Sequence, residues 1–265
     1  MLTPWAIEAV AVVFGVVVMT SLWLVQRRTS DATLVDAGWA VLVAAQAVGF
    51  GLLADGAPVR RWTVALVGGL WGGRLAFHLV RRALREGEED GRYRRLREEW
   101  GDRAQARFFW WYEMQVVVAA ALAVPFLLAA TDPNPRLGPV EIVAVILGGV
   151  GVVGEAIADR QLDRWRSDPT KRGRTCREGL WRYSRHPNYF FEWLTWCGIG
   201  LFALPSPYGW LGLVSPAAML LLLTRVTGIP PSEEQAVERR GDDYRRYQRS
   251  TSAFFPWFPK EEGAA

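Results

Sequence analysis

Long apolar blocks separated by clusters of arginine are the feature of this sequence that most limits its fold. Blocks of about 18 or more mostly apolar residues match the thickness of the bilayer hydrocarbon. Helices and strands of soluble proteins instead show short apolar runs or a single apolar face. Because backbone polar groups in lipid must be paired within each segment, the blocks predict an all-α, polytopic membrane protein.

Seven segments are predicted to cross the membrane. They comprise residues 5–25, 34–54, 62–80, 113–130, 140–158, 189–204 and 209–224. No basic residue precedes the first segment and no clear cleavage site follows it, so it is interpreted as a span and not as a signal peptide. The small residues Gly148, Gly151 and Gly154 predict a close helix–helix approach in the fifth span.

The distribution of arginine predicts the orientation. Residues 81–107, 160–185 and 225–260 hold most of the basic side chains, and an even number of spans separates these segments. By the positive-inside rule the N-terminus is then outside and the C-terminus cytoplasmic. The expected location is the bacterial inner (cytoplasmic) membrane, as a multi-pass protein. The net charge of +4 fits attraction to anionic lipid head groups and does not indicate nucleic-acid binding.

Cysteine and histidine are too scarce for a metal or disulfide framework. The chain has two cysteines and two histidines, and it has no CxxC pair. This composition excludes a disulfide scaffold and predicts no metal site. Two polar stretches, residues 92–101 and 232–249, are expected to form amphipathic surface helices. The aromatic residues of 254–259 read as an interfacial clamp.

A basic, aromatic segment leads into the sixth predicted span. Pro187 is favourable at a helix start, and the free N–H groups of a helix start attract anions. Arg185 and His186 add cationic donors beside it. Asn188 and Glu192 lie four residues apart, hence on one helix face, at a depth where polar groups are costly. A membrane-interface anchor is the alternative interpretation.

Three acidic residues follow the same face of the fifth span near its end. Glu155, Asp159 and Asp163 recur every four residues, and Arg166 follows them. Pairing with neighbouring arginines is the simpler explanation, and the other is a binding surface. The same arginines argue against a divalent metal on these carboxylates.

Polar residues also occur inside the second and third spans. Arg74 and His78 are four residues apart on one face, and an intramembrane arginine is a functional-site hypothesis by default. The alternatives are a snorkelling arginine and a hydrogen-bonded core histidine. Asp36, early in the second span, must pair with a cation or carry a proton.

Taken together, these stretches resemble the DUF1295 family. That family is grouped with the steroid 5-alpha-reductases and, more distantly, with the isoprenylcysteine carboxyl methyltransferases. The resemblance rests on residues 35–39, 70–79, 92–93, 184–196 and the aromatic tail. It implies seven transmembrane helices, a cytoplasmic C-terminus and NADPH bound in a cavity that opens to the cytoplasm.

The resemblance also implies which residues bind the cofactor. Together with the motif of residues 184–189, it assigns that role to Arg74, Glu155, Asp159, Arg166, Tyr183, Arg185, His186, Asn188, Tyr189 and Glu192. Two departures concern the proton donor. The reductases have a proton-donating tyrosine where this chain has Trp71. They also have an acidic residue beside a glutamine in the second span. This chain has no such pair, and in that span only Asp36 offers an acid.

The expected function is an NADPH-dependent membrane reductase of a C=C bond in a lipid-like substrate (steroid, isoprenoid or fatty acyl). Asp36, His78 or a tyrosine would supply the proton. Residues 1–265 would form one membrane domain, with substrate-side helices in 1–130 and a cofactor-binding region in 131–265. The alternatives are an S-adenosylmethionine-dependent methyltransferase and a non-enzymatic lipid-binding protein. The expected partners are the substrate and membrane lipids.

Overall fold

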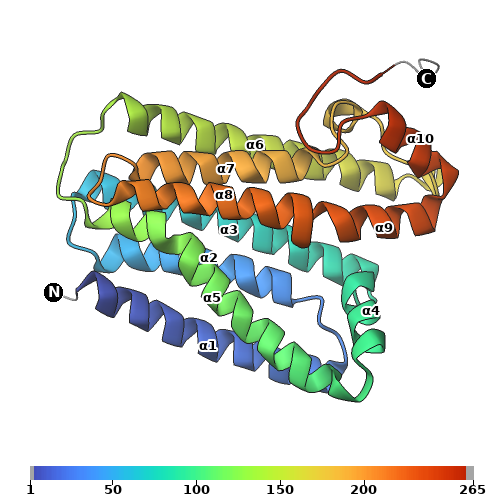
Figure 1. The fold of residues 1–265 in the computed structure, drawn as a ribbon, viewed down its shortest axis with the longest axis horizontal. Coiled ribbons are helices and arrows are strands. Elements are labelled where there is room, and N and C mark those ends of the chain that lie inside the picture. The colour runs from blue at the N-terminus through green and yellow to red at the C-terminus, as the bar shows by residue number, and fades with distance from the viewer. Residues whose placement is uncertain (1–2, 261–265) are drawn as a thin grey trace. The chain divides into compact units, whose positions relative to one another are not determined.

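A computed structural model of the chain describes residues 3–260, and every regular element in that range is a helix (Figure 1). The predicted all-α class is therefore confirmed. The chain divides into two compact units. Unit 1 consists of Met1–Glu141 and Gly200–Ser215, and unit 2 consists of Ile142–Ile199 and Pro216–Ala265.

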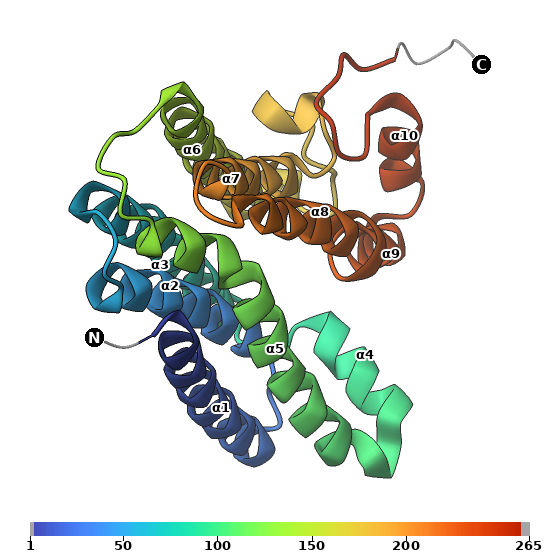
Figure 2. The same cartoon turned by 60° about the vertical axis from the view of Figure 1, so that its left-hand side comes forward.

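Unit 1 is built from four long helices that lie side by side in both ribbon views (Figures 1 and 2). They are α1 (Pro4–Thr29), α2 (Val35–Leu53), α3 (Pro58–Glu86) and α5 (Ala104–Thr131). The short helix α4 (Gly91–Trp100) and the 3-10 turn η1 (Gly101–Arg103) connect α3 to α5. Helix α2 contacts α1, α3 and α5, so it forms the centre of this unit.

Glycine allows α2 and α3 to approach closely. A Cβ atom added to Gly72 would lie 2.7 Å from the carbonyl oxygen of Ala40 and 2.8 Å from Cβ of Ala44. One added to Gly68 would collide with Ala47. These contacts show that α2 and α3 run antiparallel, because the later residue on α3 faces the earlier residues on α2. Small residues at such contacts allow helices to pack in lipid.

Unit 2 is organised around α6 and α7. Its elements are most of α6 (Pro139–Ser167) and of α7 (Pro187–Ala203), the turns η2 (Pro169–Lys171) and η3 (Gly179–Arg182), and the C-terminal helices α9 (Ile229–Arg240) and α10 (Asp242–Ser250). Helix α8 (Val214–Leu221), which follows the turn η4 (Gly209–Leu213), also enters this unit and continues into a π-helical turn, η5 (Leu222–Val226).

The membrane character of the helices is confirmed by their length and composition. Six segments of the described chain are long and apolar enough to cross a membrane. They are Pro4–Thr29, Val35–Leu53, Pro58–Arg85, Gly91–Thr131, Pro139–Ser167 and Gly209–Arg240. The helix at the predicted sixth span, α7, has 17 residues. The count of seven spans and the orientation stay predictions.

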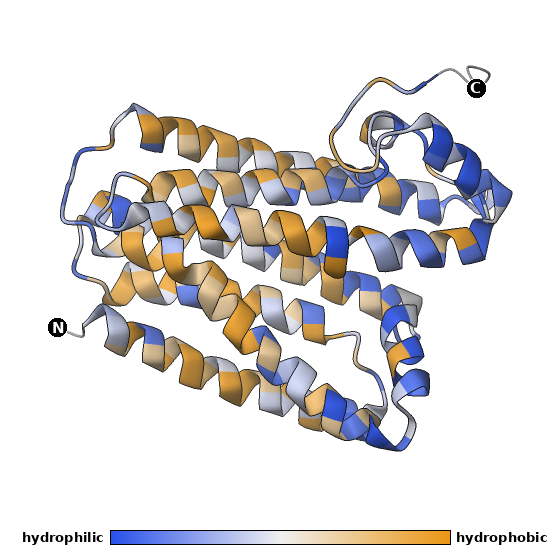
Figure 3. Ribbon diagram, viewed as in Figure 1, coloured by the Kyte–Doolittle hydropathy of each residue, from blue (hydrophilic) through white to orange (hydrophobic). Residues whose placement is uncertain are grey.

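Exposed apolar side chains follow one face of α6. Along α6, Ile142, Ile146, Val150 and Val153 are each at least half exposed and recur every three or four residues. This spacing places them on one face of the helix. In Figure 3 most of α6 is hydrophobic, whereas α9 and α10 are mainly hydrophilic. A face of this kind is suited to contact with membrane lipids.

The C-terminal region differs from its prediction. The sequence predicts one amphipathic helix over residues 232–249, but α9 and α10 are separate helices that meet at Gly241. The φ angle of Gly241 is +53°, a conformation that disfavours other residues. The last predicted span also ends irregularly. The amide of Thr227 donates to the carbonyl of Leu222 at 2.8 Å, and two prolines that begin α9 prevent an unbroken helix.

Candidate functional site

The antiparallel pair of α6 and α7 forms a face that carries several of the predicted cofactor residues. A Cβ atom on Gly198 would lie 2.6 Å from the amide nitrogen of Gly148, and one on Gly151 would lie 2.6 Å from that of Thr195. Gly154 packs against the ring of Phe191. The predicted close approach at the glycines of α6 is thus confirmed. The spacing of these contacts places position 188 opposite residue 158.

Buried acids lie beside this line of contacts. Glu155 and Asp159 on α6 are 2% and 6% exposed, and Glu192 on α7 is 8% exposed. Each of the three acids directly follows a position that faces the other helix, namely Gly154, residue 158 and Phe191. Burying a carboxylate is costly unless it is paired or hydrogen-bonded. Because the acids lie on two neighbouring helices at the same level, they make this face of α6 and α7 acidic.

Asn188 stands in the first turn of α7, on the same face as Glu192. Its Oδ1 atom is buried and has no hydrogen-bond partner among residues 3–260. A buried acceptor left unpaired costs about 1–3 kcal/mol, and buried polar atoms in native proteins are nearly always paired. The amide of Asn188 therefore points to a polar group that residues 3–260 do not supply.

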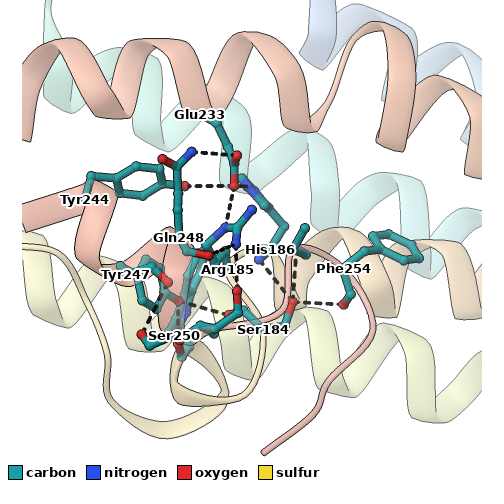
Figure 4. A network of polar contacts seen from close by, with 12 residues as sticks. Ser184, Arg185, His186, Glu233, Tyr244, Tyr247, Gln248, Ser250 and Phe254 are labelled. Carbon is teal, nitrogen blue, oxygen red and sulfur yellow. Dashed lines mark hydrogen bonds and ion pairs between the residues drawn. The ribbon is translucent and has the colours of Figure 1, made fainter. Parts of the chain in front are cut away.

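Arg185 is held by the C-terminal region of the chain (Figure 4). Its Nε atom donates to Oε1 of Glu233 at 2.6 Å, and its Nη1 atom donates to the carbonyls of Gln248 at 2.9 Å and Thr251 at 2.6 Å. Its backbone amide donates to the carbonyl of Ser252 at 2.8 Å. The guanidinium predicted to hold a phosphate thus has a carboxylate and two carbonyls as partners.

His186 belongs to the same network. Its Nε2 atom lies 3.3 Å from Oε1 of Glu233, and its ring stacks on that of Tyr189 at an interplanar angle of 4°. The hydroxyl of Tyr189 lies 3.1 Å from that of Ser232. Burial lowers the pKa of His186 below its usual value, although the Glu233 carboxylate partly opposes this effect. The structure therefore favours a neutral imidazole that is fixed in orientation.

The segment after α10 is fastened to the turn before α7. The amide of Trp257 donates to the carbonyl of Tyr183 at 2.9 Å, and the hydroxyl of Ser184 donates to the carbonyl of Phe254 at 2.9 Å. Tyr247 donates to the carbonyl of Ser184 at 3.0 Å. Tyr183 also meets the ring of Phe258 edge to face. The motif around Arg185 thus serves as a docking surface for the tail of its own chain.

Arg166, another predicted cofactor residue, lies in the last turn of α6 and is exposed. Arg74 and His78 lie on α3 and are half-buried. The antiparallel contacts of α2 and α3 place His78 level with the first turn of α2. That turn carries Asp36, so the two predicted catalytic residues occupy the same end of the helix pair. Trp71, the residue at the expected tyrosine position, is fully buried.

Asp36 is engaged on both of its carboxylate oxygens. Tyr93 donates its hydroxyl to Oδ1 at 2.6 Å, and Arg92 donates to Oδ2 at 2.7 Å. Arg92 also contacts Asp90, whose side chain caps the start of α4. Because both of its oxygens are engaged by a guanidinium and a phenol, Asp36 is better suited to orient Tyr93 than to donate a proton itself.

Two clusters contain residues that sequence reasoning missed. Glu233, which gathers Arg185, His186 and the amide of Gln248, was read only as part of a surface helix. In unit 1 the fully buried Arg60 contacts Glu141 at 2.6 Å and Asp132 at 3.4 Å. The one available signal near Glu233 was the pair of tyrosines Tyr244 and Tyr247, three residues apart in the following helix. No local sequence pattern indicates that Glu141 and Asp132 are the partners of Arg60.

The fold and these sites define a class of protein: a polytopic α-helical membrane protein with polar clusters among its helices. The chain belongs to the family described as "Protein of unknown function (DUF1295)", which matches residues 22–251. It is also similar to the uncharacterized protein C594.04c of Schizosaccharomyces pombe (strain 972 / ATCC 24843). That similarity is 30% identity over 268 residues, covering 89% of this chain and 75% of the yeast protein. No solved structure matches the chain significantly.

Proposed function

We propose that the chain is an NADPH-dependent membrane reductase that reduces a carbon–carbon double bond of a lipid-like substrate. The observation that carries this proposal is the buried amide oxygen of Asn188, which has no hydrogen-bond partner within residues 3–260. It stands in the first turn of α7, level with the buried acids of α6. Ribose hydroxyls and a carboxamide are the donors that such a face would accept, and carboxylates are common partners of ribose hydroxyls in dinucleotide sites.

The residues of unit 2 fit the proposed cofactor in part. Glu155, Asp159, Asn188 and Glu192 offer acceptors on neighbouring helices, and the free N–H groups at the start of α7 favour an anionic group. Arg185 is committed to Glu233 and to the tail, so in this proposal it builds the site without touching phosphate. Positive charge for the phosphates would come from residues of the same unit, such as Arg166 at the end of α6.

The reaction needs a hydride and a proton. When bound, NADPH would supply the hydride to one carbon of the double bond, and the protein would supply a proton to the other. Asp36 has both oxygens engaged as acceptors, so the proposal gives the proton-donor role to His78. The contact of Tyr93 with Asp36 would then fix the start of α4 beside the substrate.

The proposed membrane follows from the arginine distribution. The basic segments 81–107, 160–185 and 225–260 would face the cytoplasm. A relative from a fission yeast gives no support for the bacterial inner membrane expected from the sequence. We therefore propose only that the basic segments face the cytoplasm. A localisation experiment would identify the membrane.

Cofactor titration tests the proposal. In detergent, the wild-type protein should bind NADPH, measured by energy transfer from tryptophan to the bound nicotinamide, and should not bind S-adenosylmethionine. Asn188→Ala and Asp159→Ala should each weaken NADPH binding by about 1–3 kcal/mol. Asn134→Ala, at the only other asparagine of the chain, is the matched control and should bind normally.

Two outcomes would contradict the proposal. Unchanged NADPH affinity in both Asn188→Ala and Asp159→Ala would remove the site from this face. Tight binding of S-adenosylmethionine in place of NADPH would favour the methyltransferase, the second candidate that the resemblance names. Circular dichroism and gel filtration of each variant separate a lost contact from a lost fold.

A further inference from the structure

A second group of buried polar atoms without partners lies in unit 1. Gln46 on α2 is 2% exposed, and among residues 3–260 neither its Nε2 nor its Oε1 atom has a hydrogen-bond partner. Oε2 of Glu8 on α1 is also buried and unpartnered within the same range. An amide and a carboxylate inside membrane-spanning helices are costly to bury unless something pairs with them.

Contacts along α1 place these two side chains close to each other. A Cβ atom added to Gly15 of α1 would lie 3.2 Å from the side chain of Leu42 on α2, and one added to Gly38 of α2 would meet the side chains of Leu22 and Met19 on α1. The two helices are therefore antiparallel, with residue 15 facing residue 42. Two helical turns towards the start of α1 lead from Gly15 to Glu8, on the same face. The same step along α2 leads from Leu42 past Gln46 to residue 49.

Helix α5 closes the third side of this place. A Cβ atom added to Gly15 would lie 2.8 Å from the side chain of Val116 on α5, and Thr20 donates to Glu113 at 2.8 Å. The stripe of α1 that carries Glu8 therefore faces both α2 and α5. Because Glu8 shares this stripe with Gly15, its side chain is directed into the bundle and not towards lipid.

The position opposite Glu8 is open. A Cβ atom added to Gly49 meets no heavy atom within 4 Å, in contrast to Gly15, Gly38, Gly68 and Gly72, where a neighbour lies closer than 3 Å. Glu8, Gln46 and Gly49 thus combine an acceptor, a group that both donates and accepts, and open space at position 49. The fully buried Leu42 and Phe50 on the same helix make the surroundings apolar.

We propose that Glu8, Gln46 and Gly49 form a binding site for the hydroxyl group of a lipid alcohol. The hydroxyl would donate to the Glu8 carboxylate and accept from the Gln46 amide, and the apolar body would lie among α1, α2 and α5. The inference rests on the proposed function in one respect: it names this alcohol as the substrate of the reductase.

The site also predicts a length for the substrate. Gln46 and Asp36 are ten residues apart on α2, which corresponds to roughly 15 Å along a helix. His78 lies level with Asp36. A substrate held by its hydroxyl at Gln46 would therefore present, roughly 15 Å away, the double bond that receives the proton. Long-chain or polycyclic alcohols have this dimension.

Photolabelling tests the site without any need for turnover. The probes are an octadecanol that carries a diazirine and an alkyne, and its methyl ether, which cannot donate a hydrogen bond. In wild-type protein the alcohol should label peptides of α1, α2 and α5 about fivefold more strongly than the ether, as expected for one lost hydrogen bond. Glu8→Ala and Gln46→Leu should reduce alcohol labelling to the level of the ether. Gly49→Leu should reduce labelling by both probes.

Glu113→Gln is the matched control, because Glu113 lies on the same helix contact but is bonded to Thr20. It should be labelled like the wild type. Equal labelling by alcohol and ether, or wild-type labelling of Glu8→Ala and Gln46→Leu, would overturn the inference. NADPH titration of the same samples separates the two proposals: lost labelling selectivity with normal NADPH binding removes only this site, whereas selective labelling without NADPH binding removes only the reductase.

Discussion

Arg60 in unit 1 and Arg185 in unit 2 have the same kinds of hydrogen-bond partner, but the two side chains differ in burial. Each donates to one carboxylate at 2.6 Å and to two backbone carbonyls. The side chain of Arg60 is fully buried, and a second acid, Asp132, lies 3.4 Å away. That of Arg185 is 11% exposed and has one acid, Glu233.

The difference in burial and in the number of acidic partners determines how much each arginine contributes to stability. Near Arg60, the guanidinium neutralises two buried acids, so its removal would leave negative charge in a dry environment. The Arg185 guanidinium mainly orders backbone carbonyls at the end of α10, and water can replace some of its hydrogen bonds. The number of buried charges left behind should therefore set the cost of each substitution, and the following predictions test that view.

Arg60→Leu should cause the largest loss of stability. Breaking a buried ion pair by removing one partner costs about 3–5 kcal/mol, because the remaining charge is uncompensated. Thermal or SDS-induced unfolding in detergent measures the loss. Arg61→Leu is the matched control: Arg61 donates to the carbonyls of Gly51 and Leu52, both at 2.9 Å, and should lose only about 1 kcal/mol. Equal losses in the two variants would break the comparison.

Arg185→Lys should have the next largest effect, about 1–3 kcal/mol, because a lysine cannot reproduce the fork that reaches Glu233 and two carbonyls. The tail should loosen first. Hydrogen exchange of the Trp257 amide, which donates to Tyr183, should speed up. Arg182→Lys, at an exposed arginine nearby, should leave that exchange rate unchanged.

The Arg185 variant also sharpens the functional question. If the arginine held phosphate, Arg185→Lys would weaken NADPH binding and leave the exchange of the Trp257 amide at the wild-type rate. A double-mutant cycle with Glu233→Gln then measures the direct coupling between the two side chains. Additive effects of the two substitutions would show that their contact contributes little.

Asp90 provides an intermediate case, since its partners Arg82 and Arg92 are about one-third exposed. Burial raises the pKa of Asp90, but Arg92 and Arg82 outweigh it and hold that pKa at about 2. Because the folded-state pKa is depressed, this stabilisation is present above about pH 4 and is lost as the pH falls towards 2, and it amounts to at most about 2 kcal/mol. Asp90→Asn should remove this pH dependence, measured as the unfolding midpoint between pH 5 and 2. A wild-type slope in the variant would contradict the assignment.

His186 should give the smallest effect. Burial lowers its pKa, so the unfolded chain binds the proton more readily than the folded protein does. Stability should therefore fall as the pH drops below about 6.5, by less than the 1.4 kcal/mol per pH unit that one proton can contribute. In His186→Gln this slope between pH 7.5 and 5 should disappear. The same slope in both proteins would assign it to another group.

The helices could be predicted because their signals are local, although α3 and α5 extend beyond the predicted spans 62–80 and 113–130. The predicted span 34–54 differs from α2 by one residue at each end, and α1 begins where Thr3 caps it and Pro4 starts it. Pro58, Pro139 and Pro187 likewise begin their helices. The break at Gly241 was missed, because a glycine within a polar, periodic stretch is compatible with a continuous helix until a positive φ is required.

The candidate site was less predictable than the fold. Sequence reasoning found Asn188 and the acids of α6 as polar residues at membrane depth, and the packing of α6 against α7 brings them to one level. It read Arg185 as a ligand donor, since an arginine at a helix start fits an anion equally well from outside the protein or from Glu233. It found neither Glu233 nor Gln46 as a candidate, because neither carries a motif.

The sequence by itself determined that this protein is helical, crosses the membrane several times and belongs to its family, since length, hydropathy and helix-start residues act over a few turns of chain. Only the tertiary structure decided the partners. Arg60 meets Glu141 across 81 residues, and Arg185 meets Glu233 across 48. Which carboxylate a guanidinium meets, and which amide stays unpaired, depends on how whole helices pack, and no short stretch of sequence contains that information.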